Sequence, residues 1–210
     1  MSKLYTEIFD KERLAVWKKL AILRDIGALA GGTGLALQLK HRISYDFDIF
    51  CEKSVGKRFL LRVKEIFGKE NIKIVIDSSN ELTVLYKEEI KISFVYFPFE
   101  ARYEKIKSGS IELFDVRDLL SNKAYAVGRR GAWRDYADIF WCLKKEKIDL
   151  KGLIKETEKR FGGVFSEKLF LEQLVYFDDI EDMAVEWIDA KISNDEIKKF
   201  LSEEVRKYLR

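Results

Sequence analysis

The stretch that decides the fold is residues 29–50, LAGGTGLALQLKHRISYDFDIF. It opens with a small apolar run that predicts a buried strand, and the glycines at positions 31 and 32 then predict a turn. Residues 34–40 suit a short helix, and the hydroxyl of Thr33 suits the N-cap position of that helix. The alternation of acidic and aromatic residues in YDFDIF predicts a second strand. A strand, a turn, a helix and an acidic strand therefore follow one another within 22 residues.

Asp46 and Asp48 are two residues apart, so on a strand their side chains point to the same face, while Phe47 and Ile49 point to the other. Two neighbouring carboxylates repel each other, and a divalent cation between them removes that repulsion. Hard oxygen ligands suit Mg²⁺ or Mn²⁺. The pattern therefore predicts Asp46 and Asp48 as metal ligands. The alternative is a pair of carboxylates on the solvated face of a sheet.

The glycine turn adds a place for a phosphate. Gly31 and Gly32 let the backbone approach a ligand closely, and the helix behind them presents N–H groups and the positive end of its dipole. A helix of about eight residues rises roughly 12 Å, so the chain can return and lay the acidic strand beside the first strand. A metal on the acidic strand and a phosphate at the glycine turn would then lie next to each other, which indicates phosphoryl or nucleotidyl transfer. The alternative is an ordinary strand-to-helix turn.

Composition limits the remaining classes of function. The chain has 210 residues, of which 47% are hydrophobic and 36% charged, enough for a real core in one domain with an appendage or in two small domains. A net charge of +3 is too small for a protein that coats duplex nucleic acid, although a local basic site stays open. Cys51 and Cys142 lack metal-ligand spacing and are interpreted as reduced core thiols. With no apolar run long enough for a leader or a membrane span, we expect a cytoplasmic protein.

The rest of the chain divides at about residue 113. Strands are predicted from residues 72, 82 and 90, after helices at 8–25 and 56–67. Helical segments are then predicted at 115–128, 133–145, 150–161, 166–176 and 194–209, the last with a Ser-x-x-Glu capping box at Ser193. We therefore expect an α/β (α+β) protein, with a mixed-sheet core in residues 1–113 and a helical region in residues 114–210.

The order Gly31-Gly32, thirteen residues, Asp46-Phe47-Asp48 resembles the signature of the DNA polymerase β-like nucleotidyltransferase superfamily. The longer sequence pattern of residues 29–50 resembles the AbiEii/AbiGii toxin family of that superfamily. Members of this family share Gly-Gly-Thr-x-Leu-Ala-Leu, His-Arg, Ser and Asp-Phe-Asp in that order. His41-Arg42 and Ser44 match this pattern. The resemblance implies a site that binds the triphosphate of a nucleotide, and the expected substrate-binding residues are Gly31, Gly32, Thr33, Arg42 and Ser44, together with Arg134 downstream.

A second block, DLLSNKAYAVGRRGAWRDYADIFWCL at residues 118–143, resembles the downstream motif of the same family. The family places a Lys on one helix and Arg/Lys-Asp-x-x-Asp at the start of the next, which here are Lys123, Arg134, Asp135 and Asp138. The resemblance implies that Lys123 contacts nucleotide phosphates and that Asp135 completes or orients the acidic cluster. From the residues alone, a lysine on a helix such as Lys123 is usually a solvated charge, and Asp138 could be a structural partner of a nearby arginine.

The resemblance implies a Mg²⁺- or Mn²⁺-dependent enzyme that moves a nucleoside monophosphate from an NTP to an acceptor hydroxyl. The acceptor expected within the family is RNA, tRNA 3′ ends in particular. The biological role implied is that of a toxin in a toxin–antitoxin or abortive-infection system, balanced by a separate antitoxin protein. Asp46, Asp48, Lys123 and Asp135 are the expected catalytic residues, with the metal on Asp46 and Asp48. We expect no membrane partner.

The chain departs from the superfamily on a later strand, where many members carry a third carboxylate. The segment IKISFVYF offers Lys91 and Ser93 there instead. Either Asp135 substitutes, metal binding is weak, or catalysis is impaired. Three other functions therefore stay open: a protein-nucleotidylating enzyme of antitoxin type, a catalytically impaired nucleotide-binding regulator, and an interaction module whose helical half docks a partner.

Overall fold

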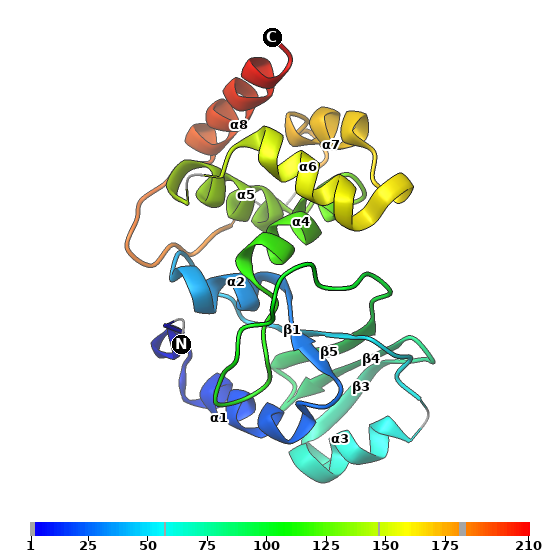
Figure 1. Ribbon diagram of the computed structural model, residues 1–210. Helices are drawn as coiled ribbons and strands as arrows, with labels where there is room; N and C mark the ends of the chain where they lie inside the picture. The colour runs from blue at the N-terminus through cyan, green and yellow to red at the C-terminus, as the bar shows by residue number, and fades with distance from the viewer. Residues whose placement is uncertain (1–2, 57, 147, 181–183) are drawn as a thin grey trace. The chain divides into compact units, whose positions relative to one another are not determined.

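The computed structural model describes residues 3–56, 58–146, 148–180 and 184–210. The chain forms two compact units, Met1–Asp115 and Val116–Arg210. We call them the N-terminal unit and the C-terminal unit. All strands of the described residues belong to the N-terminal unit, and the C-terminal unit is helical (Figure 1).

Within the described residues, the N-terminal unit has five strands in one mixed sheet of order β1-β2-β5-β4-β3. β2 and β5 are parallel, and the other neighbouring strands are antiparallel. This confirms the predicted α/β fold with a small mixed sheet. The strands are β1 (Gly27–Leu29), β2 (Phe47–Cys51), β3 (Ile72–Asp77), β4 (Glu81–Tyr86) and β5 (Ile90–Tyr96), and the α-helices of this unit are α1 (Lys11–Leu20), α2 (Gly31–Leu39) and α3 (Phe59–Phe67).

One face of the sheet is apolar and carries the core of the N-terminal unit. Helices α1 and α3 cover this face (Figure 1). Alternation along β2, β4 and β5 sends every second side chain into this core, and each fully buried large apolar side chain stabilises the fold by about 1.5–3 kcal/mol. The core contains Val16, Trp17 and Leu20 of α1, Val63 and Phe67 of α3, Phe47 and Ile49 of β2, Leu82 and Val84 of β4, and Ile92 and Phe94 of β5.

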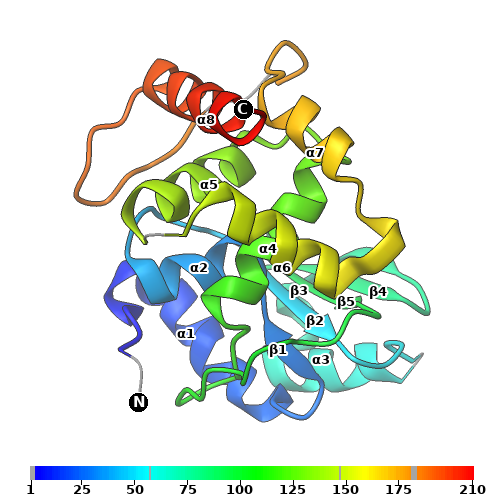
Figure 2. The same cartoon turned by 45° about the horizontal axis from the view of Figure 1, so that its top comes forward.

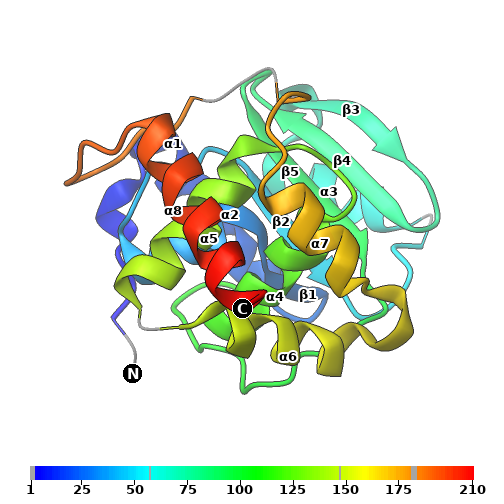
Figure 3. The same cartoon turned by 90° about the horizontal axis from the view of Figure 1, so that it is seen from above.

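The second face of the sheet is polar, and strand pairing decides which side chains meet on it. Asp48 on β2 lies opposite Ser93 on β5, and Ser93 lies opposite Thr83 on β4. β4 turns into β5 through Lys87 and Glu88, whose φ values of 52° and 58° suit a two-residue hairpin turn. β3 is the edge strand beyond β4 (Figure 3). The face that holds the acidic residues is therefore built from three adjacent strands.

The helices of the C-terminal unit are α4 (Val116–Val127), α5 (Trp133–Lys145), α6 (Leu150–Phe161), α7 (Glu167–Leu174) and α8 (Asn194–Tyr208). α4 packs against both α5 and α6 (Figure 2). A buried ion pair joins α4 to α6, since the guanidinium of Arg160 donates to the carboxylate of Asp118 at 2.9 Å. Asp149, Ser166 and Ser193 cap α6, α7 and α8 by accepting a bond from a backbone N–H of the first turn.

Two element boundaries differ from the sequence-based expectation. α2 begins at Gly31 with Ala30 as N-cap, so Thr33 lies in the first turn and is not the cap. Its hydroxyl bonds instead to Ser44 and to the backbone oxygen of Asp46, partners that only the returning chain supplies. α3 begins at Phe59, and the predicted start near residue 56 includes residue 57, which lies outside the described residues.

In the parts of the chain that the structure describes, no helix combines the length and the apolar character that crossing a bilayer requires.

Both cysteines are free and buried, as the sequence indicates. Burial raises the pKa of the Cys51 thiol to about 12, and burial together with the carboxylates of Asp138 and Glu146 raises that of Cys142. Both thiols therefore stay protonated at pH 8.

We predict that a thiol-specific reagent at pH 8 labels the native protein at least about 100-fold more slowly than the protein in denaturant, because the thiolate is the reactive form. Counting labelled thiols against time checks this. Rapid labelling of either cysteine in the native protein would contradict it.

Candidate functional site

The polar face of the sheet holds the two aspartates of the sequence motif. Asp48 lies within β2, and Asp46 precedes it by two residues. Phe47 and Ile49 are fully buried in the apolar core, so the aspartates share the opposite face. This is the arrangement that the period-two pattern predicts.

The glycine turn lies directly against Asp48. The backbone N–H of Ala30 donates to the backbone oxygen of Asp48 at 2.7 Å. Gly31 has a φ of +61°, and a Cβ added there would lie 2.4 Å from Oδ2 of Asp48. Glycine is therefore required at position 31 both by the backbone conformation and by the carboxylate that occupies the space of a side chain.

Gly32 makes a second close contact, with residues of the segment between α2 and β2. A Cβ on Gly32 would lie 2.4 Å from Nη2 of Arg42 and 3.1 Å from Oγ of Ser44. Arg42 is buried, and its guanidinium donates to the backbone oxygen of Ile43 at 3.0 Å. The structure thus brings Gly32, Arg42 and Ser44 together, as the predicted substrate-binding set requires.

The hydroxyls of Thr33 and Ser44 are already engaged with the protein. Thr33 donates to the backbone oxygen of Asp46, which can only accept, and Ser44 therefore donates its own proton to Thr33 across 2.9 Å. Both residues are buried. These bonds fix the chain that leads into β2 and hold Asp46 beside the start of α2.

The start of α2 has backbone N–H groups that could stabilise an anion. The first intrahelical bond runs from the N–H of Gly34 to the oxygen of Ala30 at 3.0 Å. The N–H groups of the three preceding residues have no partner within the helix. Together with the helix dipole, of about half a positive charge, they give this end of α2, next to the two carboxylates, the properties that favour an anion such as phosphate.

Sequence reasoning missed the partner of Asp46. Nζ of Lys91 on β5 lies 3.2 Å from Oδ2 of Asp46. Both side chains are more than one third exposed, so the pair contributes little to stability. Its sequence signal is the alternation of Lys91 and Ser93, which places both on the polar face once β5 is paired with β2. In this structure the ammonium of Lys91 balances the charge of Asp46.

The donor set fits a divalent cation that arrives with phosphate ligands. Among the described residues, no group of three or more His, Cys, Asp or Glu side chains is placed to hold a metal ion. Asp46 and Asp48 supply two hard oxygen donors on one face. Mg²⁺ is commonly bound through one or two carboxylates, with waters and substrate phosphates filling the remaining positions. Two aspartates beside a helix start that suits phosphate fit that pattern.

The residues of the second sequence block form a buried charged cluster within the C-terminal unit. Nζ of Lys123 on α4 lies 2.6 Å from Oδ1 of Asp135 and 2.9 Å from Oδ2 of Asp138, both on α5. Arg130 adds a bond to Oδ2 of Asp135 at 3.2 Å from the exposed side. Lys123 is thus not the solvated charge that its type alone suggests. Arg134, on the same helix α5, is exposed.

We predict that Lys123→Met lowers the free energy of unfolding by about 3–5 kcal/mol, because it leaves the Asp135 and Asp138 carboxylates buried without their shared cation. The matched control is Arg130→Met. Its side chain pairs with the same Asp135 but is 66% exposed, so its loss is expected to cost less than about 1 kcal/mol. Urea unfolding measures both, and equal stabilities of Lys123→Met and wild type would contradict the prediction.

We predict that Gly31→Ala destabilises the protein by about 1–2 kcal/mol from the positive φ alone, and more from the contact with Asp48. Gly109→Ala is the control, since a Cβ at Gly109 meets nothing within 4 Å. Thermal unfolding of the two variants checks this. A Gly31→Ala variant as stable as Gly109→Ala would show that the carboxylate does not occupy this space.

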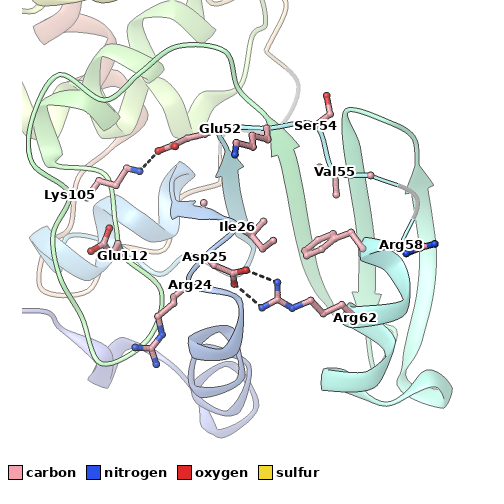
Figure 4. A pocket seen from close by; sticks show the side chains of 14 residues that line it. Arg24, Asp25, Ile26, Glu52, Ser54, Val55, Arg58, Arg62, Lys105 and Glu112 are labelled. Carbon is pink, nitrogen blue, oxygen red and sulfur yellow. Dashed lines mark hydrogen bonds and ion pairs between the residues drawn. The ribbon is translucent and has the colours of Figure 1, made fainter.

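The N-terminal unit also has a hollow of about 840 Å³ at the opposite end of β1 and β2. Figure 4 shows two ion pairs at its wall, Arg62 with Asp25 at 2.7 Å and Lys105 with Glu52 at 2.5 Å. The side chains of Arg24 and Arg58 extend away from the centre of the hollow. Its charges do not converge on one point, so we do not assign it to the reaction.

Comparisons with known proteins show the family of this chain. A family model described as the nucleotidyl transferase AbiEii toxin of type IV toxin–antitoxin systems matches residues 18–208. The chain belongs to this family. The AbiEii match spans both units, so the helical region is part of the family's common structure.

Other known proteins resemble this AbiEii family member over most of its length. The uncharacterized protein aq_aa25 of Aquifex aeolicus (strain VF5) is 30% identical over 214 residues, covering 100% of this chain and 99% of that one. A crystal structure of a proposed nucleotidyltransferase from H. pylori has a TM-score of 0.58 at 18% identity and covers 95% of each chain. The structure of JHP933 from Helicobacter pylori has a TM-score of 0.55 at 19% identity, covering 97% and 92%. Both structures show the same fold.

Proposed function

We propose that this AbiEii family protein transfers a nucleoside monophosphate from an NTP to an acceptor hydroxyl of RNA, with tRNA as the first candidate. The observation that carries the proposal is the contact between the start of α2 and Asp48. It joins a place for phosphate to a place for a metal within one unit. Family membership supports the reaction class, and growth inhibition relieved by a cognate antitoxin is the expected outcome in a cell.

In the proposed reaction the acceptor hydroxyl oxygen attacks the α-phosphorus of the NTP. A P–O bond to the acceptor forms, the P–O bond to the β-phosphate breaks, and pyrophosphate leaves. The acceptor proton passes to an aspartate of the site or to water. A bound Mg²⁺ or Mn²⁺ would supply charge stabilisation for the phosphates. The residues of this chain would hold the triphosphate at the N–H groups of residues 31–33 and orient it against Asp46 and Asp48.

The roles of the remaining predicted residues follow from their partners. Thr33 and Ser44 position Asp46 through their mutual hydrogen bonds. Arg42 packs its guanidinium against Gly32 of the glycine turn. Lys123 and Asp135 are bound to each other at 2.6 Å, which favours a joint role in which the lysine holds the Asp135 carboxylate in place. A phosphate contact of Lys123 or of the exposed Arg134 stays a prediction.

We predict that Asp46→Asn and Asp48→Asn each abolish label transfer from α-labelled NTPs to total tRNA in the presence of Mg²⁺. Loss of an outer-shell partner of a metal typically costs 10–100-fold, so loss of a ligand is expected to cost at least about 100-fold. Asp77→Asn is the control, because Asp77 is an exposed carboxylate at the end of the edge strand β3.

The same assay with cell lysate identifies the acceptor class. Label on RNA that requires both aspartates supports the proposal. Label on protein alone would replace the RNA acceptor by a protein hydroxyl. Absence of label, together with no Mg²⁺-dependent NTP binding in calorimetry, would overturn the enzyme proposal.

A further inference from the structure

Three polar side chains continue from Asp48 across the sheet. Ser93 lies opposite Asp48 on β5, and Thr83 lies opposite Ser93 on β4. Oγ1 of Thr83 is 3.1 Å from Oγ of Ser93 and 2.7 Å from Oε1 of Glu81. Ser93 and Thr83 are buried. Ser93 occupies the strand position where the superfamily signature leads us to expect a third carboxylate.

The direction of these hydrogen bonds follows from the number of protons. A hydroxyl has one proton, and an ionised carboxylate can only accept. Thr83 must therefore donate to Glu81. The 3.1 Å contact between the Thr83 and Ser93 hydroxyl oxygens is then a hydrogen bond that Ser93 donates to Thr83. With its proton directed toward β4, the oxygen of Ser93 keeps its lone pairs for the other side, where Asp48 lies.

We propose that Ser93 is the third oxygen ligand of the divalent cation held by Asp46 and Asp48, and that Thr83 and Glu81 are positioning residues that aim its lone pairs. This inference rests on the metal site of the proposed function. It explains how the neutral Ser93 can replace a carboxylate as a metal ligand. A hydroxyl that donates its proton to another residue acts toward the cation only as an acceptor. Glu81 acts from a distance, through Thr83, and does not touch the cation.

A neutral third ligand has a consequence for affinity. Two carboxylates and one hydroxyl carry one negative charge less than three carboxylates, and Lys91 lies 3.2 Å from one of the two. The cation alone is therefore held weakly, and the phosphates of a nucleotide supply the missing charge. Replacing Ser93 by a carboxylate should reverse this and strengthen binding of the metal alone.

The test measures Mn²⁺ binding to the full chain without nucleotide, by electron paramagnetic resonance of the free ion. We expect Ser93→Ala to weaken binding about 10-fold or more, within the range for a lost metal partner. Thr83→Val removes the acceptor of the Ser93 proton, so it is expected to weaken binding severalfold. Thr83→Ser keeps the hydroxyl and should bind like wild type. Ser93→Asp should bind more tightly, an effect that a misfolded variant cannot produce.

The outcomes separate this inference from the proposed function. If Ser93→Ala and Thr83→Val bind Mn²⁺ like wild type while Asp48→Asn does not, the metal site stands and the role of Ser93 is overturned. If Thr83→Ser is as weak as Thr83→Val, the hydroxyl is not what matters and the positioning role fails. If Asp48→Asn also leaves Mn²⁺ binding unchanged, the metal site of the proposed function fails as well.

Discussion

The contact between Gly31 and the carboxylate of Asp48 is the constraint on which the N-terminal unit depends. It requires a residue without a Cβ at the start of α2, and it requires β2 to return beside the end of β1. Once both conditions are met, the N–H groups of a helix start lie next to two carboxylates on the polar face of the sheet. The buried bonds of Thr33 and Ser44 then hold Asp46 at the same place. The proposed chemistry rests on this juxtaposition of a helix start, which suits an anion, with two carboxylates, which suit a cation.

Charge in this site is balanced by neighbouring residues. Lys91 offsets Asp46 across 3.2 Å, and Ser93 contributes an oxygen without a charge. In the C-terminal unit, Lys123 offsets two buried aspartates in the same way. The buried cluster needs its cation for stability, because carboxylates without a partner are expensive to bury. The Asp46–Lys91 ion pair is partly exposed, so breaking it costs little free energy. Asp46 could therefore exchange Lys91 for a metal ion, as the proposed function requires.

Much of this site could be predicted from the sequence because it rests on local periodicity. Two aspartates two residues apart share a face in any strand, and a glycine pair before a short helix marks a phosphate-binding turn. Thr33 was predicted as a cap because capping is a local preference, and this was wrong because Ser44 and Asp46 offer it partners from the returning chain. Lys91, Thr83 and Glu81 could not be placed for a similar reason. Their contacts depend on the pairing of β2, β4 and β5, which no local pattern specifies. The burial of Lys123 depends in the same way on the packing of α4 against α5.

The most direct test of the central claim is anomalous diffraction from crystals of this protein with Mn²⁺ and a non-hydrolysable NTP. The account predicts an anomalous peak between the carboxylates of Asp46 and Asp48, with the triphosphate at the backbone N–H groups of Gly31, Gly32 and Thr33. A metal peak elsewhere, or a triphosphate bound away from the start of α2, would contradict it.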